Sequence, residues 1–402
     1  MKGMMVAQAI PIIISPVLTR IYTPQDFGLF ALFVALTVLF GTIANGRYEQ
    51  AILLPEREND ALCLMVLGGL VAFFVSAMLL VVVIWFGPEI AAALNHPGIA
   101  PWLYLVPATV LMTGLFNLLS HFSNRQRAYT DLRDATIAKS AVGAAVQVGV
   151  GLMKSGVAGL VIGQVVSLIA GTVRLFRTLQ ERRGPIRLPR RVCILGAAGR
   201  YGNFPKFQVP HAALNSFASQ MPVYLFAAFF TSGIVGFYAL AIRAVFLPMN
   251  IIASSAAKVF NERASQAYKA GEDVHGLTLR TLKSAATRVV APFALFVFFA
   301  PDIFSFVFGE AWREAGHYVQ ILSPWLLMVF IVSMVTYIPA LYERQKRALV
   351  IEILYTTLRF VSLMTGIWMH SVYVAMMLFS VSGFAVLAYN LYWIVALTKE
   401  RP

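Results

Sequence analysis

The sequence predicts an all-α integral membrane protein with about twelve transmembrane helices. Hydrophobic residues make up 59% of the 402 residues and charged residues only 12%, whereas soluble domains carry roughly 25% charged residues. The mean hydropathy is +0.74. Apolar runs of about 20 residues, the length at which a helix crosses a bilayer, recur along the chain. Helices are the expected form, because every backbone amide in hydrocarbon must be bonded within its own segment.

Apolar runs separated by charged breaks define the elements in order. The predicted spans are 3–19, 27–46, 62–86, 101–121, 132–153, 156–177, 204–230, 233–256, 285–308, 317–341, 348–368 and 371–397. The longest charged segment divides six spans from six. We therefore expect an N-terminal six-helix bundle at 1–180, a basic cytoplasmic linker at 181–203 and a C-terminal six-helix bundle at 204–402. The linker fits either an anchor to anionic lipid or a docking site for a partner.

Lysine and arginine predict the orientation. With the N-terminus inside, the inside segments hold 26 basic residues. The outside segments hold three, which are Arg20, Lys154 and Arg313. The remaining three of the 32 fall within spans and are Lys139, Arg243 and Arg359. Because cytoplasmic loops carry the excess of Lys and Arg, both termini are predicted to be cytoplasmic. The net charge of +14 then records topology, and we expect the lipid bilayer and no nucleic acid as a partner.

The two halves carry a short repeat. Thr23-Pro-Gln-Asp-Phe-Gly-Leu-Phe-Ala-Leu32 aligns with Thr231-Ser-Gly-Ile-Val-Gly-Phe-Tyr-Ala-Leu240, with Thr, Gly, Ala and Leu in common. Each copy starts at an outside loop and enters the second span of its half. This predicts a parallel repeat with a pseudo-two-fold axis along the membrane normal, a symmetry typical of transporters.

The sequence gives no positive sign of an enzyme. The sequence contains no HExxH, no GxxxxGK[ST], no GxGxxG after a strand and no GxSxG. We therefore expect no catalytic residues, no metal and no cofactor. Cys63 and Cys193 lie far apart in the sequence and suggest neither a disulfide framework nor a metal site. No small-residue cleavage pattern follows 4–19, so we expect a first transmembrane helix rather than a signal peptide. Whether that helix is complete stays open.

Two regions resemble a known family. The stretch 18–32 (LTRIYTPQDFGLFAL) with 45–55 (NGRYEQAILLP), and the stretch 201–263 with Phe204-Pro-Lys-Phe207 and Gly236-Phe-Tyr-Ala-Leu-Ala-Ile-Arg243, are similar to Wzx-type polysaccharide flippases. The resemblance implies the multidrug/oligosaccharidyl-lipid/polysaccharide exporter superfamily. It also implies a multi-pass protein of the bacterial inner (plasma) membrane. Such a protein would move undecaprenyl-diphosphate-linked oligosaccharide units from the cytoplasmic to the periplasmic leaflet by alternating access, for O-antigen lipopolysaccharide or exopolysaccharide. A polysaccharide polymerase or chain-length regulator would be a further partner.

A diphosphate crossing between two bundles requires a central cationic cavity, and Arg suits phosphate because its planar donors match phosphate oxygens in pairs. A charge at the bilayer centre costs about 2.5–3.5 kcal/mol even on lenient scales, so such cations usually face a cavity. The candidate diphosphate contacts, in order, are Arg243, Arg47, Lys139, Arg359 and Arg20. Structural alternatives remain open: snorkelling of Lys139, a charge network of Arg359 with Glu352, and a salt bridge of Arg20 with Asp26.

Polar stripes provide candidate glycan contacts. Gln208, Asn215 and Ser219 share one helical face, as do Asn117, His121 and Asn124. Such residues also join membrane helices by hydrogen bonds, and both roles stay open. For ion coupling the candidates are Glu352, the acid placed well inside a span, and Glu49 at the inside end of the second span.

Two rival functions remain. A multidrug exporter of the same superfamily would move organic cations, for which acidic groups inside the bundle are expected, whereas the predicted spans hold more cations than anions. A non-transporting membrane scaffold of a glycan-assembly complex would tolerate loss of Arg243.

Overall fold

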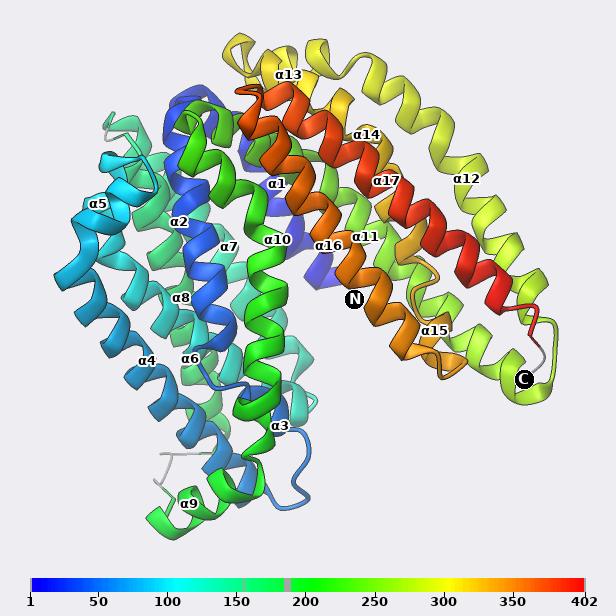
Figure 1. Cartoon of the computed structure of the whole chain (residues 1–402). Helices are drawn as coiled ribbons and strands as arrows, with labels where there is room; N and C mark the ends of the chain where they lie inside the picture. Colours follow the sequence, from blue (N-terminus) through cyan, green and yellow to red (C-terminus); the bar gives the residue numbers. More distant parts are fainter. Residues whose placement is uncertain (1, 155, 184–188, 401–402) are drawn as a thin grey trace. The chain divides into compact units, whose positions relative to one another are not determined.

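The computed structural model describes residues 2–154, 156–183 and 189–400 (Figure 1). Positions 184–188 of the predicted basic linker lie outside the described residues. Within the described part every regular element is helical. The first ten helices are α1 (Lys2–Ile21), α2 (Pro24–Ile43), α3 (Tyr48–Ala51), α4 (Glu58–Ala93), α5 (Ala100–Leu103), α6 (Leu105–Arg125), α7 (Tyr129–Leu152), α8 (Ala158–Arg183), α9 (Arg191–Arg200) and α10 (Val209–Phe229). The others are α11 (Ser232–Ala270), α12 (Val274–Phe298), α13 (Ala300–Phe308), α14 (Arg313–Ser333), α15 (Ile338–Leu341), α16 (Gln345–Trp368) and α17 (Val372–Leu397).

The helices follow the predicted spans. Ten helices of the described chain are long and apolar enough to cross a membrane. The predicted spans 3–19 and 204–230 coincide with α1 and α10, which complete the twelve positions. The prediction of an all-α, multi-pass membrane protein is confirmed.

Helix ends differ most from the prediction on the side expected to be cytoplasmic. The segment 257–288 was predicted to connect two spans, yet it is almost wholly helical, because α11 runs on to Ala270 and α12 begins at Val274. The predicted span 285–308 is not one helix: the chain turns at Phe299, between α12 and α13.

Packing divides the chain into two compact units, residues 1–236 and 237–402. The boundary falls inside α11. The predicted bundles were instead drawn at the basic linker between 180 and 204. The contacts define compact units and do not test where the six-helix bundles begin and end, so the predicted bundle boundaries stay a prediction.

In unit 1 the closest pair of helices is α7 and α8, which meet at four-residue spacing, mostly through small residues. Gly143, Gln147 and Gly151 on α7 face Gly159, Gly163 and Ser167 on α8. A Cβ added at Gly143 would come within 2.7 Å of the Ser167 Cβ. The Tyr22 hydroxyl donates to the Gln147 carbonyl oxygen at 2.6 Å and so ties this pair to the end of α1. Small residues at such crossings let helix backbones approach closely in a membrane.

A second close crossing joins the starts of α2 and α11, and it is reciprocal. A Cβ at Gly28 would overlap the backbone of Ser232, and a Cβ at Gly236 would overlap the backbone of Pro24. In the ten-residue repeat Gly28 corresponds to Gly236 and Pro24 to Ser232. Such mutual contacts between equivalent residues are what a two-fold axis produces. The predicted repeat therefore gains a structural counterpart at this crossing.

The two cysteines correct an expectation. Cys63 at the start of α4 and Cys193 on α9 form a disulfide, with their Cα atoms 6.0 Å apart. The pair was not expected because 130 residues separate the two positions. The fold brings them together because α9 packs against α4, with Cys63 fully buried in the same cluster as Leu64 and Ala197.

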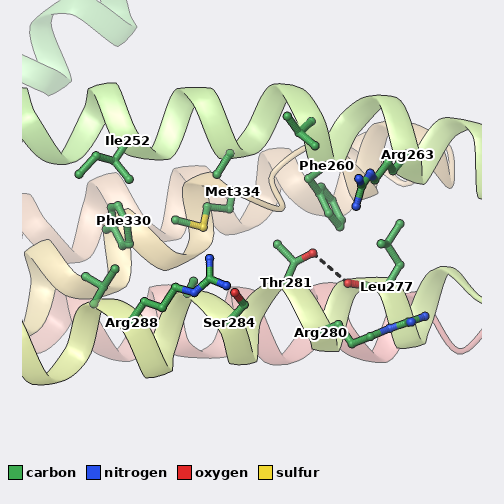
Figure 2. A pocket seen from close by; sticks show the side chains of 14 residues that line it. Ile252, Phe260, Arg263, Leu277, Arg280, Thr281, Ser284, Arg288, Phe330 and Met334 are labelled. Atoms are coloured by element: carbon green, nitrogen blue, oxygen red, sulfur yellow. Dashed lines mark hydrogen bonds between the residues drawn. The ribbon is translucent and has the colours of Figure 1, made fainter.

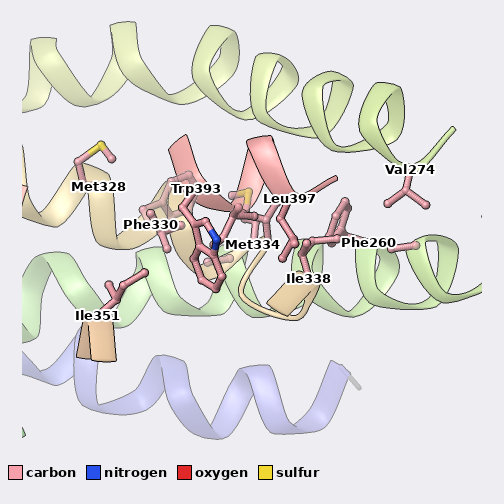
Figure 3. Packing of buried hydrophobic residues seen from close by; sticks show 14 of the residues in the cluster. Phe260, Val274, Met328, Phe330, Met334, Ile338, Ile351, Trp393 and Leu397 are labelled. Atoms are coloured by element: carbon pink, nitrogen blue, oxygen red, sulfur yellow. The ribbon is translucent and has the colours of Figure 1, made fainter. Parts of the chain in front are cut away.

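Unit 2 is centred on α14 and α17, which pack against each other, while α16 lies along α17 (Figure 1). A Cβ at Gly366 would overlap the backbone of Ala375, so α16 and α17 also meet at a glycine. Figure 3 shows the apolar cluster at one end of this unit. Its members come from α11, α12, α14, α16 and α17, and include Phe260, Val274, Phe330, Ile351 and Trp393. Through this cluster the C-terminal part of α11 and the N-terminal part of α12 pack against the rest of the unit.

The reciprocal glycine crossing should tolerate no side chain. We expect Gly28→Ala and Gly236→Ala each to lower the free energy of unfolding by about 1–3 kcal/mol, since overpacking forces backbone shifts of that cost. The measurement is the thermal unfolding of purified protein in detergent. Gly149→Ala is the control, because a Cβ there meets nothing within 4 Å. An equal effect at all three positions would contradict the close crossing.

The disulfide predicts the thiol content of the chain. Denatured protein treated with a maleimide should carry no label before reduction and two labels after it, because Cys63 and Cys193 are the only cysteines. Intact-mass spectrometry of both samples measures this. Two labels without reductant would show that the thiols are free in the protein as isolated.

Candidate functional site

A polar turn follows α2. In hydrocarbon the chain would have to continue as a helix, because its backbone amides must be bonded within the segment. Gly46 and Arg47 both adopt left-handed φ values, 59° and 62°. This conformation costs a non-glycine residue roughly 1–2 kcal/mol. Such strain persists only where the surroundings fix it and is enriched at functional sites. The Asn45 side-chain amide donates to the Gly114 carbonyl oxygen at 3.0 Å and so holds the turn against α6.

Four side chains from this turn and from α6 form a group that we call the α2–α3 turn cluster: Asn45, Arg47, Glu49 and His121. Arg47 Nη1 lies 3.5 Å from Glu49 Oε1, and their side chains are 21% and 6% exposed. Arg47 also lies within electrostatic reach of His121. Three residues that were predicted separately, Arg47, Glu49 and His121, are thus brought together.

The cluster holds several polar atoms without a hydrogen-bond partner in the described part of the chain. They are Asn45 Oδ1, Arg47 Nε, Glu49 Oε2 and His121 Nδ1. Buried polar atoms nearly always have a partner, so each such atom calls for an explanation. Donors and acceptors in one place match the hydroxyl groups of a sugar, and the buried carboxylate can hold a proton.

Glu49 is the acidic member of this cluster and lies outside the candidate spans. Burial raises the pKa of its carboxyl, and the Arg47 guanidinium only partly offsets that effect. Desolvation disfavours the charged form of a carboxyl. The prediction that Glu49 takes part in ion coupling therefore rests on a group whose proton affinity is increased, whereas Glu352 is exposed on α16.

The other predicted cations lie in different surroundings. Arg243, on α11 in unit 2, is half-buried and has no ion pair among the described residues. Lys139 on α7 places its ammonium over the Phe116 ring, 4.7 Å from the centroid. Arg20 is exposed at the end of α1, and Asp26, which was considered as its partner, forms the capping box of α2 with Thr23.

Arg359 occupies an aromatic box, a feature that the sequence did not indicate. Its guanidinium lies over the rings of Phe379, Tyr355 and Trp325, at 4.3, 4.8 and 5.2 Å from the centroids. The residue is 9% exposed. The expected network with Glu352 has no ion pair in the described part of the chain. Tyr355, four residues before Arg359, was the available signal, since this spacing places two side chains on one helical face.

The predicted glycan stripes differ in exposure. Gln208, Asn215 and Ser219 are exposed, on the turn before α10 and on α10 itself, so their common face is available to a ligand. Asn117 and His121 on α6 are half-buried, and Asn124 is exposed near its end. Only His121 of these joins the turn cluster. Asn45 was missed by sequence reasoning, although it directly precedes the Gly46-Arg47 turn.

Comparisons with known proteins agree on family and fold. A family model described as "Polysaccharide biosynthesis protein" matches residues 17–317. A search of curated protein sequences found no match. An inward-facing multidrug resistance MATE family transporter of the MOP superfamily is similar in structure, with a TM-score of 0.78 and 14% identity over 98% of this chain and 96% of that chain.

Two further solved structures resemble the chain. The lipid II flippase MurJ in an inward closed conformation has a TM-score of 0.73 and 13% identity, over 98% of this chain and 86% of that one. A MOP superfamily transporter from Pyrococcus furiosus has a TM-score of 0.60 and 12% identity, over 99% and 95%. At these identities the likeness establishes the fold, which is that of MOP superfamily transporters.

Glu49 predicts a pH dependence of stability. A raised folded-state pKa means that the folded protein binds the proton more tightly, so wild type loses stability as pH rises from about 4.5, its ordinary value, through the raised pKa. Glu49→Gln lacks this loss. The melting temperature of the variant minus that of wild type should therefore increase from pH 5 to pH 8, measured by scanning fluorimetry in detergent.

Glu56→Gln is the matched control, because Glu56 is an exposed carboxyl in the same connection between α2 and α4. Its difference from wild type should stay constant over the same pH range. A constant difference for Glu49→Gln as well would contradict the raised pKa.

Proposed function

The chain belongs to the polysaccharide biosynthesis protein family, and from this premise we propose that it is a flippase for undecaprenyl-diphosphate-linked oligosaccharide units. It would move them from the cytoplasmic to the periplasmic leaflet of the bacterial inner membrane by alternating access, for surface polysaccharide. Both termini would be cytoplasmic, a proposal supported by the split of 26 basic residues against three.

The observation that carries this proposal is a set of cations in membrane helices without carboxylate partners. Arg243, Lys139 and Arg359 lie in candidate spans, and no ion pair involves any of them within the described residues. Cations within membrane spans are normally paired or face a cavity, because an unpaired charge in a low-dielectric region is costly. A substrate that brings its own negative charges would supply the missing partner. Organic cations, the cargo of a multidrug exporter, would not.

The roles differ among these cations. Arg243 is the first candidate for the diphosphate, since no ring or carboxylate of the described residues engages its guanidinium. Aromatic faces already stabilise the Arg359 guanidinium, each such contact contributing about 0.5–2 kcal/mol. Lys139 has one such contact. Arg47 stays a proposed diphosphate contact, while His121 of the turn cluster and the exposed face of α10 would provide sugar contacts.

The membrane potential would contribute to the direction of transport. An inside-negative potential favours outward movement of an anion by about 2.3 kcal/mol per charge per 100 mV. A diphosphate carries more than one charge, so part of the driving force would be electrical. Proton binding at Glu49 offers a route to ion coupling, since its carboxyl is buried beside Arg47.

Loss of the Arg243 charge tests this function. In the native host lacking the gene, we expect Arg243→Ala to reduce flipping about 10-fold or more and Arg243→Lys to restore part of it, because hydrogen bonds to charged groups contribute roughly 1.5–3 kcal/mol. The readout is the fraction of lipid-linked oligosaccharide that a periplasmic glycosidase reaches, together with surface polymer. Arg313→Ala, an exposed arginine paired with Asp302 in the same unit, is the control.

Three outcomes would decide between the functions. Lipid-linked units that accumulate in the cytoplasmic leaflet support the flippase. Drug resistance conferred without any effect on surface glycan would favour a multidrug exporter. Normal polymer synthesis with Arg243→Ala would favour a non-transporting scaffold for a polymerase or chain-length regulator.

A further inference from the structure

Outside the predicted site, α11 and α12 extend beyond the membrane core. A helix of 39 residues such as α11 is about 58 Å long, whereas the hydrocarbon core is about 30 Å thick. The predicted spans stop at 256 and resume at 285. The intervening helical hairpin, closed by a turn at 271–273, therefore starts at the level of the lipid headgroups on the side predicted to be cytoplasmic.

A cavity of about 670 Å³ extends from this level into the adjoining ends of the predicted spans, between α11, α12 and the end of α14. Its lining follows helical spacing. On α11 the residues recur at 252, 256, 259, 260 and 263, and on α12 at 277, 280, 281, 284, 285, 288 and 289. Both sets form a single helical face. All of these residues belong to unit 2, so the cavity is a feature of one compact body.

The cavity combines a cationic side with an apolar wall. Arg263, Arg280 and Arg288 line it together with the hydroxyl groups of Thr281 and Ser284. In Figure 2, Arg263 on α11 and Arg288 on α12 point into the space between the helices from opposite sides, while Arg280 lies along α12. Phe330 and Met334 close the back of the space.

The positive charge of this cavity has no internal partner. No acidic residue lines it. Within the described chain none of the three arginines has an ion pair, and Arg280 Nε donates a hydrogen bond to the Gly276 carbonyl oxygen at 3.1 Å. The three arginines are exposed, and a cavity that gathers three guanidinium groups and no carboxylate is suited to an anion. Guanidinium forks bind phosphate oxygens in pairs.

We propose that this cavity is a capture site for a lipid diphosphate in the cytoplasmic leaflet. Arg263 and Arg288 hold the phosphate oxygens from opposite walls, Thr281 and Ser284 donate hydroxyl hydrogen bonds, and the first part of the lipid chain lies against Phe260, Phe330 and Met334. A diphosphate is favoured over a phosphodiester headgroup, because a single negative charge would leave most of this positive charge unbalanced. The volume also falls in the range of about 300–1,000 Å³ that is usual for ligand sites.

This inference rests on the proposed function and adds a second location to it. Arg243, the first of the cations assigned to transport, lies well inside the predicted span 233–256, whereas the arginines of this cavity lie at or beyond the predicted cytoplasmic ends of their spans. A site there would concentrate the lipid-linked substrate beside the protein before the head group crosses the membrane.

The test measures binding separately from transport. The purified full chain in phosphatidylcholine nanodiscs is titrated with undecaprenyl diphosphate, and binding is followed by native mass spectrometry. We expect the double variant Arg263→Gln/Arg288→Gln to raise the dissociation constant about 10-fold or more, since it removes two charge-assisted contacts. Lys258→Gln/Lys283→Gln is the matched control, with the same charge loss on the same two helices but outside the lining.

The lipid arms identify the source of the phosphate. Undecaprenyl diphosphate should bind more tightly than undecaprenyl monophosphate, phosphatidylglycerol or cardiolipin. Equal or tighter binding of cardiolipin would overturn the proposal and assign the cavity to a bulk membrane lipid. An equal loss of binding in the lysine control would also overturn it, because general attraction to anionic lipid would then explain the effect.

A second measurement uses the wild-type chain and therefore needs no variant. A photoreactive polyprenyl diphosphate should crosslink to peptides covering 252–263 and 277–289 of the wild-type chain. Crosslinks confined to other helices would overturn the proposal. If binding and crosslinking occur as expected while wild type moves no lipid, the proposed flippase function fails and the site stands. If the arginine variant binds undecaprenyl diphosphate as tightly as wild type while wild type flips lipid, the site fails and the function stands.

Discussion

Close approach of helix backbones is the interaction on which both compact units depend. In hydrocarbon the helices gain nothing from hiding apolar side chains, since lipid is as apolar as leucine. Packing then has to come from contact at small residues. The α7–α8 pair meets at Gly143, Gly151, Gly159 and Gly163, and α16 meets α17 at Gly366. Where a backbone carbonyl occupies the place of a Cβ, glycine is the one residue that fits.

The crossing of α2 and α11 links this packing to the symmetry of the chain. Gly28 and Gly236 occupy equivalent places in the repeat, and each packs on the backbone at the first helical residue of the other copy. A pair of equivalent contacts is the pattern that a two-fold axis produces. The shared glycines of the ten-residue repeat are therefore required by packing, because a side chain at either position would disrupt the crossing of α2 and α11.

The fold could be predicted because hydrophobicity along the chain is a one-dimensional signal. The spans and the multi-pass class follow from it, as does the location of Lys139, Arg243 and Arg359 within spans. Contacts between distant segments do not. The Cys63–Cys193 disulfide depends on α9 lying against α4, and the aromatic box of Arg359 depends on Trp325 and Phe379 from two other helices. No local pattern encodes the disulfide, and for the aromatic box the local pattern offers only Tyr355, on the same helix as Arg359. Arg47, Glu49 and His121 were each visible as polar residues, yet their convergence required the left-handed turn at Gly46 and Arg47.

Charge near the membrane serves more than orientation. Arg263, Arg280 and Arg288 count among the 26 cations that set the predicted topology, and by that count alone they would be solvated anchors. Their arrangement differs from that of anchors, which point outward to many headgroups. Arg263 on α11 and Arg288 on α12 instead point into a single cavity between the two helices (Figure 2). The sequence separates cations inside spans from cations outside them. The structure adds a third group at the boundary, where a lipid headgroup first meets the protein, and binding there requires no charge to be buried before the substrate arrives.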